Sequence, residues 1–250
     1  MSDDSRPAPA GARTAAVIPA AGRGVRLGPG APKALRALNG TPMLIHAVRA
    51  MAASRAVSLV VVVAPPDGAA EVRTLLDAHA LPERTEFLVV PGGDSRQESV
   101  RLGLDALPAG IDIVLVHDAA RPLVPVDTVD GVIEAVRGGA AAVVPALPLT
   151  DTVKQVEPAA AAGEPEPVVA TPERSRLRAV QTPQGFERDT LVRAHATVTE
   201  NVTDDASMVE QLGLRVVVVP GHEEAFKVTR PLDLILAEAV LARRRLTDGF

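Results

Sequence analysis

Apolar runs and helical patterns alternate along most of the chain. The apolar runs are rich in β-branched residues and cover 14–18, 57–64, 86–90, 111–117, 140–146 and 214–219. Most of them lack the polar–apolar alternation of a half-exposed strand, which indicates strands buried on both faces, as in a parallel sheet. Helical patterns fall at 42–54, 68–80, 95–107 and 126–139, and a final helix closes the segment 227–245. This alternation predicts an α/β fold with a Rossmann-like, doubly wound and mostly parallel sheet.

The segment 148–182 interrupts the alternation. It pairs two extended stretches around a loop rich in Pro, Ala, Gly and Glu. Because an isolated hairpin is marginally stable in water, we expect this segment to protrude as an arm that a second subunit stabilises. Residues 1–13 are polar and rich in Pro and Ala, and they are expected to form a disordered tail before a single domain over 14–250.

The composition argues against several classes of function. The net charge of −5 includes no basic run, so neither nucleic acid nor a membrane surface is an expected partner. The chain has no cysteine, which excludes disulfides and thiolate metal sites, and 2% aromatic residues leave little for stacking on bases. No apolar run approaches the ~20 residues of a membrane span, and no signal-peptide core is present, so we expect a cytoplasmic protein.

Residues 19–35, PAAGRGVRLGPGAPKAL, follow the first predicted strand and combine four glycines with three basic residues. Their spacing fits neither the dinucleotide fingerprint G-x-G-x-x-G nor the P-loop pattern. Small residues still leave backbone N–H groups open to an anion, at the sheet edge where such folds bind ligands. With Arg26 and Lys33 adding positive charge, the loop predicts a phosphate cradle. A surface turn with solvated basic residues is the alternative.

Further motifs follow in a fixed order. After PAAG-x-G-x-R and Lys33 come GGDSRQES (92–99), VHDAARP (116–122), DTVK (151–154), TPER (171–174), QTPQGF (181–186), TDDAS (203–207) and KVTRPLDL (227–234). Together they resemble the 2-C-methyl-D-erythritol 4-phosphate cytidylyltransferase family over about residues 14–240. The resemblance implies a fold of the nucleotide-diphospho-sugar transferase type.

The resemblance also implies an activity and its partners. These enzymes join CTP to 2-C-methyl-D-erythritol 4-phosphate, giving 4-diphosphocytidyl-2-C-methyl-D-erythritol and pyrophosphate in non-mevalonate isoprenoid biosynthesis. It further implies Mg²⁺ as cofactor and a homodimer formed through the 148–182 arm. A ribitol 5-phosphate cytidylyltransferase is an alternative, because both polyols offer a phosphate and hydroxyls. A non-catalytic nucleotide-binding regulator is a second alternative, which the retained set of charged motif residues disfavours.

The match to the family motifs implies which residues bind the triphosphate of CTP and which bind its nucleoside. The triphosphate would contact the backbone of Pro19, Ala20, Ala21, Gly22 and Gly24. The catalytic cations would be Arg26, Lys33 and Lys227, and the cytosine and ribose would be read by Gly93, Asp94 and Ser99. Asp94 or Ser95 could equally cap the helix that begins there.

The match also implies which residues bind the acceptor substrate. Asp118 follows a buried strand, where a carboxylate is well placed to meet a ligand, and we expect it to bind Mg²⁺ and the substrate's hydroxyl end. The other expected substrate contacts are Ala119, Arg121, Thr152 and Thr182, with Arg174 as a catalytic residue on the arm. His117 is expected to be structural, and Asp204 and Asp205 are most simply a helix N-cap. Val25 departs from the basic residue often found at its position.

Overall fold

One mixed sheet forms the centre of the computed structural model, which describes residues 11–22, 32–159, 161, 163–198 and 202–247. Its parallel half consists, in order, of β6 (Ile113–Val116), β1 (Thr14–Pro19), β4 (Val57–Ala64) and β5 (Glu86–Pro91). These four strands come from the predicted apolar runs, and their side chains are buried almost throughout β1, β4 and β6. The prediction of a mostly parallel sheet is confirmed.

The other half of the sheet is mixed. β11 (Gln184–Glu187) is antiparallel to both β6 and β7 (Ala142–Pro148), and it joins the two halves. β10 (Arg178–Val180) is also antiparallel to β7, on the edge that β11 occupies. β12 (Val216–Pro220) pairs in parallel with the opposite edge of β7. The sequence did not predict β11 as a strand.

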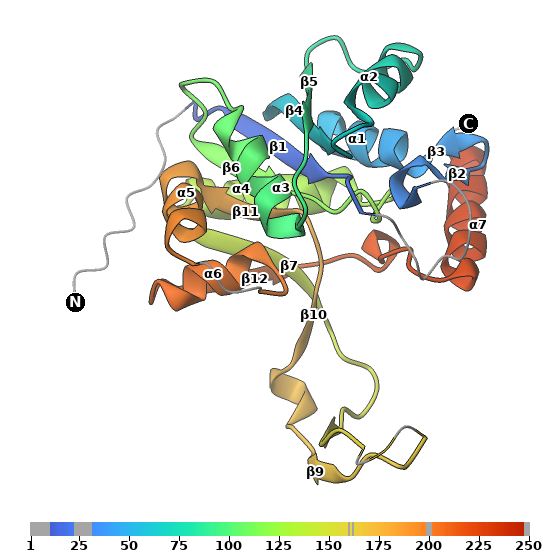
Figure 1. The fold of residues 1–250 in the computed structure, drawn as a ribbon, viewed down its shortest axis with the longest axis vertical. Coiled ribbons are helices and arrows are strands. Elements are labelled where there is room, and N and C mark those ends of the chain that lie inside the picture. Colours follow the sequence, from blue (N-terminus) through green and yellow to red (C-terminus); the bar gives the residue numbers. More distant parts are fainter. Residues whose placement is uncertain (1–10, 23–31, 160, 162, 199–201, 248–250) are drawn as a thin grey trace.

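Helices cover both faces of the sheet (Figure 1). On one face, Val60 and Val62 of β4 pack in a cluster with α1 (Met43–Ala53), α2 (Ala69–Asp77) and α4 (Val126–Arg137). On the other face, Val61 and Val63 pack with α3 (Arg96–Asp105), α5 (Arg188–Thr197) and α6 (Asp205–Gln211). Successive residues of a strand point to opposite faces, so one apolar strand supplies both cores.

A third, smaller core fixes the segment after β12. There, α7 (Pro231–Thr247) packs beside the short strands β2 (Ala37–Leu38) and β3 (Thr41–Pro42), through Leu38, Val228 and Ala237. The N–H of Val228 donates to the carbonyl of Ala120 at 2.8 Å. This bond and the burial of Val228 bring the neighbouring Lys227 to the edge of the sheet.

The segment 148–182 protrudes from the body, as expected (Figure 1). It contains β8 (Gln155–Val156), β9 (Val168–Ala170) and the short 3-10 helix η3 (Arg174–Arg176), and it returns to the sheet through β10. β8 and β9 pair with each other, and the valines at 156, 168 and 169 are exposed.

The predicted tail over 1–13 needs a correction at its end. Residues 1–10 lie outside the described residues. Ala12 is 4% exposed and belongs to a core cluster, and the N–H of Arg13 donates to the Asp112 carboxylate at 2.9 Å. Residues 12 and 13 are therefore packed against the body.

Gly103 allows α3 to approach the sheet closely. A Cβ here would lie 2.5 Å from Cγ1 of Val17 and 2.9 Å from Cγ2 of Val63, both fully buried. We expect Gly103→Ala to lower the free energy of unfolding by ~1–3 kcal/mol through overpacking, as measured by urea denaturation.

Gly131→Ala, inside α4, is the matched control. Apart from its chain neighbours and the backbone of its own helix, a Cβ there would have no described atom within 4 Å. It should raise the free energy of unfolding by ~0.5–1 kcal/mol, because alanine favours a helix over glycine. Equal effects of the two substitutions would contradict the packing explanation.

Candidate active site

A cavity of about 450 Å³ lies at the carboxyl ends of β1, β5 and β6. β4 flanks β1 on one side and β6 flanks it on the other, so β1 marks the point where the strand order reverses. Ligands of doubly wound sheets bind at such points. The cavity brings together most of the predicted residues: Pro19, Ala20, Ala21, Gly22, Lys33, Gly93, Asp94, Ser99, Asp118, Ala119 and Lys227.

The turn after β1 forms one wall. The N–H of Ala20 donates to the Val63 carbonyl at 2.8 Å, which continues the β1–β4 pairing beyond the end of β1. Gly22 follows, and Lys33 begins the 3-10 helix η2 (Lys33–Leu35) at the same cavity. Gly24 and Arg26 lie outside the described residues, so their predicted roles stay predictions.

The turn between β5 and α3 forms the opposite wall. Ser95 caps α3 by accepting from the N–H of Glu98 at 3.0 Å, while the Glu98 carboxylate accepts from the N–H of Asp94 at 2.8 Å. The Ser99 hydroxyl accepts from the N–H of Gly93 at 3.2 Å. These bonds fix the backbone of the turn, and the predicted helix cap is confirmed with Ser95 as the capping residue.

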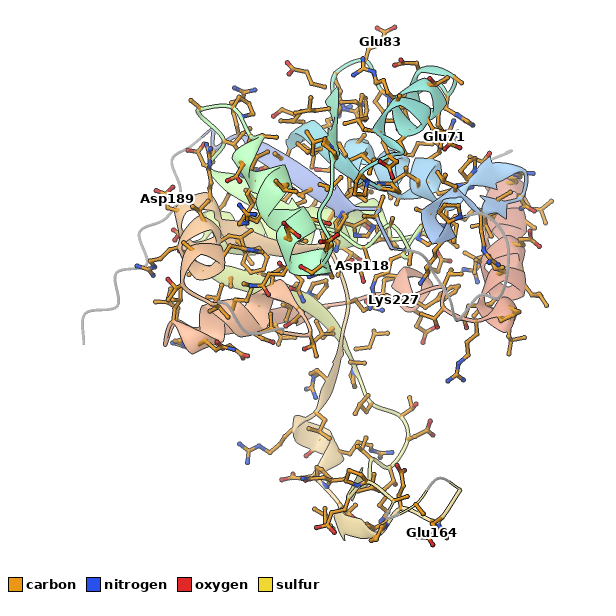
Figure 2. The ribbon with its side chains drawn as sticks, viewed as in Figure 1. Glu71, Glu83, Asp118, Glu164, Asp189 and Lys227 are labelled. Atoms are coloured by element: carbon orange, nitrogen blue, oxygen red, sulfur yellow. The ribbon has the colours of Figure 1, made fainter. Side chains whose placement is uncertain are left out.

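Asp118, the second residue after β6, is the electrostatic centre of the cavity. One carboxylate oxygen lies 2.7 Å from Nζ of Lys227, and the other lies 3.7 Å from Nε of Arg96. Figure 2 shows Asp118 and Lys227 close together in the body of the protein. Burial acts to raise the pKa of Asp118, but the charges of Lys227, Arg96 and Arg121 outweigh burial and hold this pKa at about 2.

Arg121 and Thr182 contact Asp118 from outside the cavity lining. The Arg121 guanidinium donates to the carbonyls of Ala225 at 2.7 Å and Val180 at 3.2 Å, and it lies 4.0 Å from the Asp118 carboxylate. The buried Thr182 hydroxyl accepts from the N–H of Asp118 at 3.1 Å. Neither residue lines the cavity in this structure, although both were expected to contact substrate.

His117 is structural, as predicted. It is fully buried, with Nδ1 3.0 Å from the Thr182 hydroxyl and Nε2 3.1 Å from the Arg121 carbonyl. Burial lowers the pKa of His117 to about 4, so the imidazole is neutral near pH 7. A neutral ring bonded at both nitrogens holds the strand end that carries Asp118.

The sequence did not predict the roles of Arg96 and Asp205 at the site. Arg96 lines the cavity, and its Nη1 lies 2.7 Å from the carboxylate of Asp205. Asp204 caps α6 by accepting from the N–H of Ser207, as predicted, but Asp205 is buried and pairs with Arg96 and His195. Asp205 therefore does more than belong to a helix start.

The predicted arm residues stand apart from the cavity, which no described residue of the arm lines. Thr152 is exposed, and Arg174 donates to the carbonyl of Thr150 within the arm. In Figure 2 the arm extends away from Asp118 and Lys227, with Glu164 near its far end. One chain thus does not bring these two residues to its own cavity in this structure.

The donor atoms at the cavity fit a magnesium ion that is shared with phosphates. Asp94 and Asp118 are the lining carboxylates, and the described residues include no cluster of three or more His, Cys, Asp or Glu side chains that could hold a metal. Mg²⁺ commonly takes one or two carboxylates and completes its shell with waters and substrate phosphates. The residues therefore suit a metal bound together with a nucleotide.

A doubly wound sheet with cations and a carboxylate at its switch point defines the class of α/β nucleotide-binding proteins. A family model described as 2-C-methyl-D-erythritol 4-phosphate cytidylyltransferase (IspD) matches residues 14–243. The chain belongs to this family, and it is a cytidylyltransferase of non-mevalonate isoprenoid biosynthesis. No described helix is long and apolar enough to cross a membrane.

Individual relatives agree with the family assignment. A cytidylyltransferase of the same description from Streptomyces avermitilis is 91% identical over 250 residues, all of both chains. One from Frankia casuarinae is 53% identical over 97% of this chain and 86% of its own length. The solved 4-diphosphocytidyl-2C-methyl-D-erythritol synthase of Anaerococcus prevotii superposes with a TM-score of 0.78 at 26% identity, covering 93% of this chain and all of that one.

Proposed function

We propose that the cavity joins CTP to 2-C-methyl-D-erythritol 4-phosphate, releasing pyrophosphate. The observation that carries this proposal is the convergence of Lys33, Lys227 and Asp118 on one cavity between two fixed turns. Such an arrangement suits a reaction between two polyanions, which requires charge to be neutralised and the reactants to be aligned.

The reaction needs no general base. A phosphate monoester has a second pKa of about 6, so its oxygen is already largely deprotonated near neutral pH. This oxygen attacks the α-phosphorus of CTP, a new P–O bond forms, and the bond to the bridging oxygen breaks as pyrophosphate leaves. The protein's task is to position both reactants and to stabilise the charge on the phosphoryl oxygens.

The β1 turn and the lysines are proposed to act on the triphosphate. Backbone N–H groups of Ala21 and Gly22 would contact phosphate oxygens, together with Gly24 and Arg26 as the sequence predicts. Pro19 has no N–H and the N–H of Ala20 donates to Val63, so these two residues would line the CTP site rather than donate to it. Lys33 and Lys227 would stabilise the transition state. Lys227 is paired with Asp118 here, and because its ammonium group has three N–H donors, it can turn toward a phosphate.

The β5–α3 turn is proposed to read the nucleoside. Its backbone at Gly93 and Asp94 and the side chain of Ser99 line the cavity. Cytosine offers a donor at N4 and an acceptor at O2, and backbone groups held by the hydrogen bonds of this turn can tell it from uracil.

Asp118 is proposed to serve the acceptor side and the metal. Its carboxylate would bind Mg²⁺, which supplies Lewis-acid neutralisation of the phosphates when bound, and would face the acceptor hydroxyls. Ala119, Arg121 and Thr182 adjoin it, while Thr152 and Arg174 would come from the arm of a partner subunit in a homodimer. The exposed valines of the arm are consistent with such a partner.

The acceptor is tested directly by a panel of polyol phosphates. We expect CTP- and Mg²⁺-dependent pyrophosphate release with 2-C-methyl-D-erythritol 4-phosphate, and much slower release with ribitol 5-phosphate. Turnover on ribitol phosphate alone would favour the alternative acceptor. Nucleotide binding without turnover on any member of the panel would favour a non-catalytic regulator.

A further inference from the structure

Arg96 stands between the two halves of the proposed site. It is the first residue of α3, directly after the capping Ser95, and its side chain lines the cavity. The guanidinium lies 3.7 Å from Asp118 on one side and 2.7 Å from Asp205 on the other. An arginine guanidinium stays protonated near pH 7, so Arg96 is a permanent positive charge between the two carboxylates.

Asp205 is a buried and firmly held partner for this arginine. It is 1% exposed, and its other carboxylate oxygen lies 3.0 Å from Nε2 of His195, which is also buried. A buried carboxylate is costly unless it is paired and hydrogen-bonded, so breaking its contact with Arg96 is unfavourable. The position of Arg96 on α3 is therefore fixed by Asp205 of α6, which is itself held by His195 of α5.

The three cations around Asp118 differ in how they are held. Arg121 is bound to two backbone carbonyls, and Arg96 is bound to Asp205. The side chain of Lys227 is 40% exposed, and among the described residues Asp118 is its recorded partner. Of the three, Lys227 is thus the one most able to move toward a substrate phosphate.

When Lys227 turns to the phosphate, Arg96 and Arg121 are the side-chain cations of the described residues that stay beside Asp118, while the proposed Mg²⁺ would bind its carboxylate from the substrate side. We propose that Arg96 is a positioning residue of the acceptor half, the lasting counter-ion that holds the Asp118 carboxylate in place, and that Asp205 is its buried anchor. This inference rests on the proposed function. It deepens that function, because the Arg96–Asp205 pair would affect acceptor binding through Asp118 without contacting the acceptor itself.

A purely structural role makes a different prediction. If the Arg96–Asp205 pair merely ties α3 to α6, weakening it lowers stability and affects CTP and the acceptor alike. If it holds Asp118, then at saturating Mg²⁺ the loss falls mainly on the acceptor, because the proposed contacts of CTP come from the turns after β1 and β5. The ratio of the two KM values therefore separates the two roles.

The test uses Asp205→Asn, which keeps the size of the side chain and removes its charge. At saturating Mg²⁺ we expect the KM for 2-C-methyl-D-erythritol 4-phosphate to rise by about 10-fold, the scale of weakening one charged hydrogen bond, while the KM for CTP changes by less than about 2-fold. Arg96→Lys should give the same split, because it keeps the charge but loses the fork that spans both carboxylates.

Asp105→Asn is the control, since it removes an exposed carboxylate of α3 that pairs with Arg101 at 3.5 Å. It should leave both KM values unchanged. An unchanged acceptor KM in folded Asp205→Asn, or equal rises for both substrates, would overturn the inference. If Asp205→Asn does not fold, the same criteria apply to Arg96→Lys. A wild-type protein without any cytidylyl transfer would instead overturn the proposed function, and this inference with it.

Discussion

Lys227→Ala is expected to lower kcat by at least ~100-fold, the scale of losing one preorganised charge contact to a transition state. The residue that follows Lys227 fixes its backbone at the cavity, while its side chain is less firmly held. The buried Val228 and the bond from its N–H to the Ala120 carbonyl fix the backbone beside it. The ammonium group itself stays half-exposed and can exchange Asp118 for a phosphate.

Steady-state kinetics with CTP and 2-C-methyl-D-erythritol 4-phosphate would measure this effect. A fall in kcat with little change in KM indicates an interaction made in the transition state, whereas a rise in KM alone indicates ordinary ground-state binding. Arg101→Ala is the control, because it also removes one positive charge, from the exposed surface of α3, and it should change kcat by less than about 2-fold. A wild-type kcat in Lys227→Ala would remove this lysine from the mechanism.

The parallel half of the sheet could be predicted because its strands are buried on both faces. Runs such as 57–64 contain almost no polar residue, and β4 spans these same residues. β11 has no such run, since Phe186 is its one large apolar residue. Its strand conformation depends on pairing with β6 and β7, and its close fit depends on Gly185, where a Cβ would lie 2.4 Å from Val132.

The two walls of the cavity could also be predicted, because the segments that follow β1, β5 and β6 must meet at one edge of a parallel sheet. The Arg96–Asp205 pair could not. Asp205 follows a capping aspartate, so a local interpretation as part of the helix start accounts for it fully. Only the packing of α3 against α5, and of α5 against α6, shows that its carboxylate faces an arginine far away in the chain.

The proposed exchange of arms leads to the second large effect. Pure Arg174→Ala and pure Lys227→Ala should each lose at least ~100-fold in kcat. Co-expressed in equal amounts, so that subunits assemble at random, the two variants should recover about a quarter of the wild-type activity in a symmetric dimer. The reason is that Arg174 is carried on the arm, whereas Lys227 lies in the body.

This recovery follows from counting sites. Random assembly makes about half of the dimers mixed, and each mixed dimer has one site that combines an intact body with an intact partner arm. Its other site carries both lesions. Half of the sites in half of the dimers are therefore active.

Lys33→Ala co-expressed with Lys227→Ala is the control, because both lesions lie in the body and no combination of subunits restores a site. If each arm serves its own body, the Arg174→Ala and Lys227→Ala mixture stays inactive as well. Sedimentation of the same samples then decides whether dimers formed without exchanging arms or did not form at all. Recovery in the first mixture and none in the second would mean that the arm, which here extends away from its own cavity, completes the cavity of its partner.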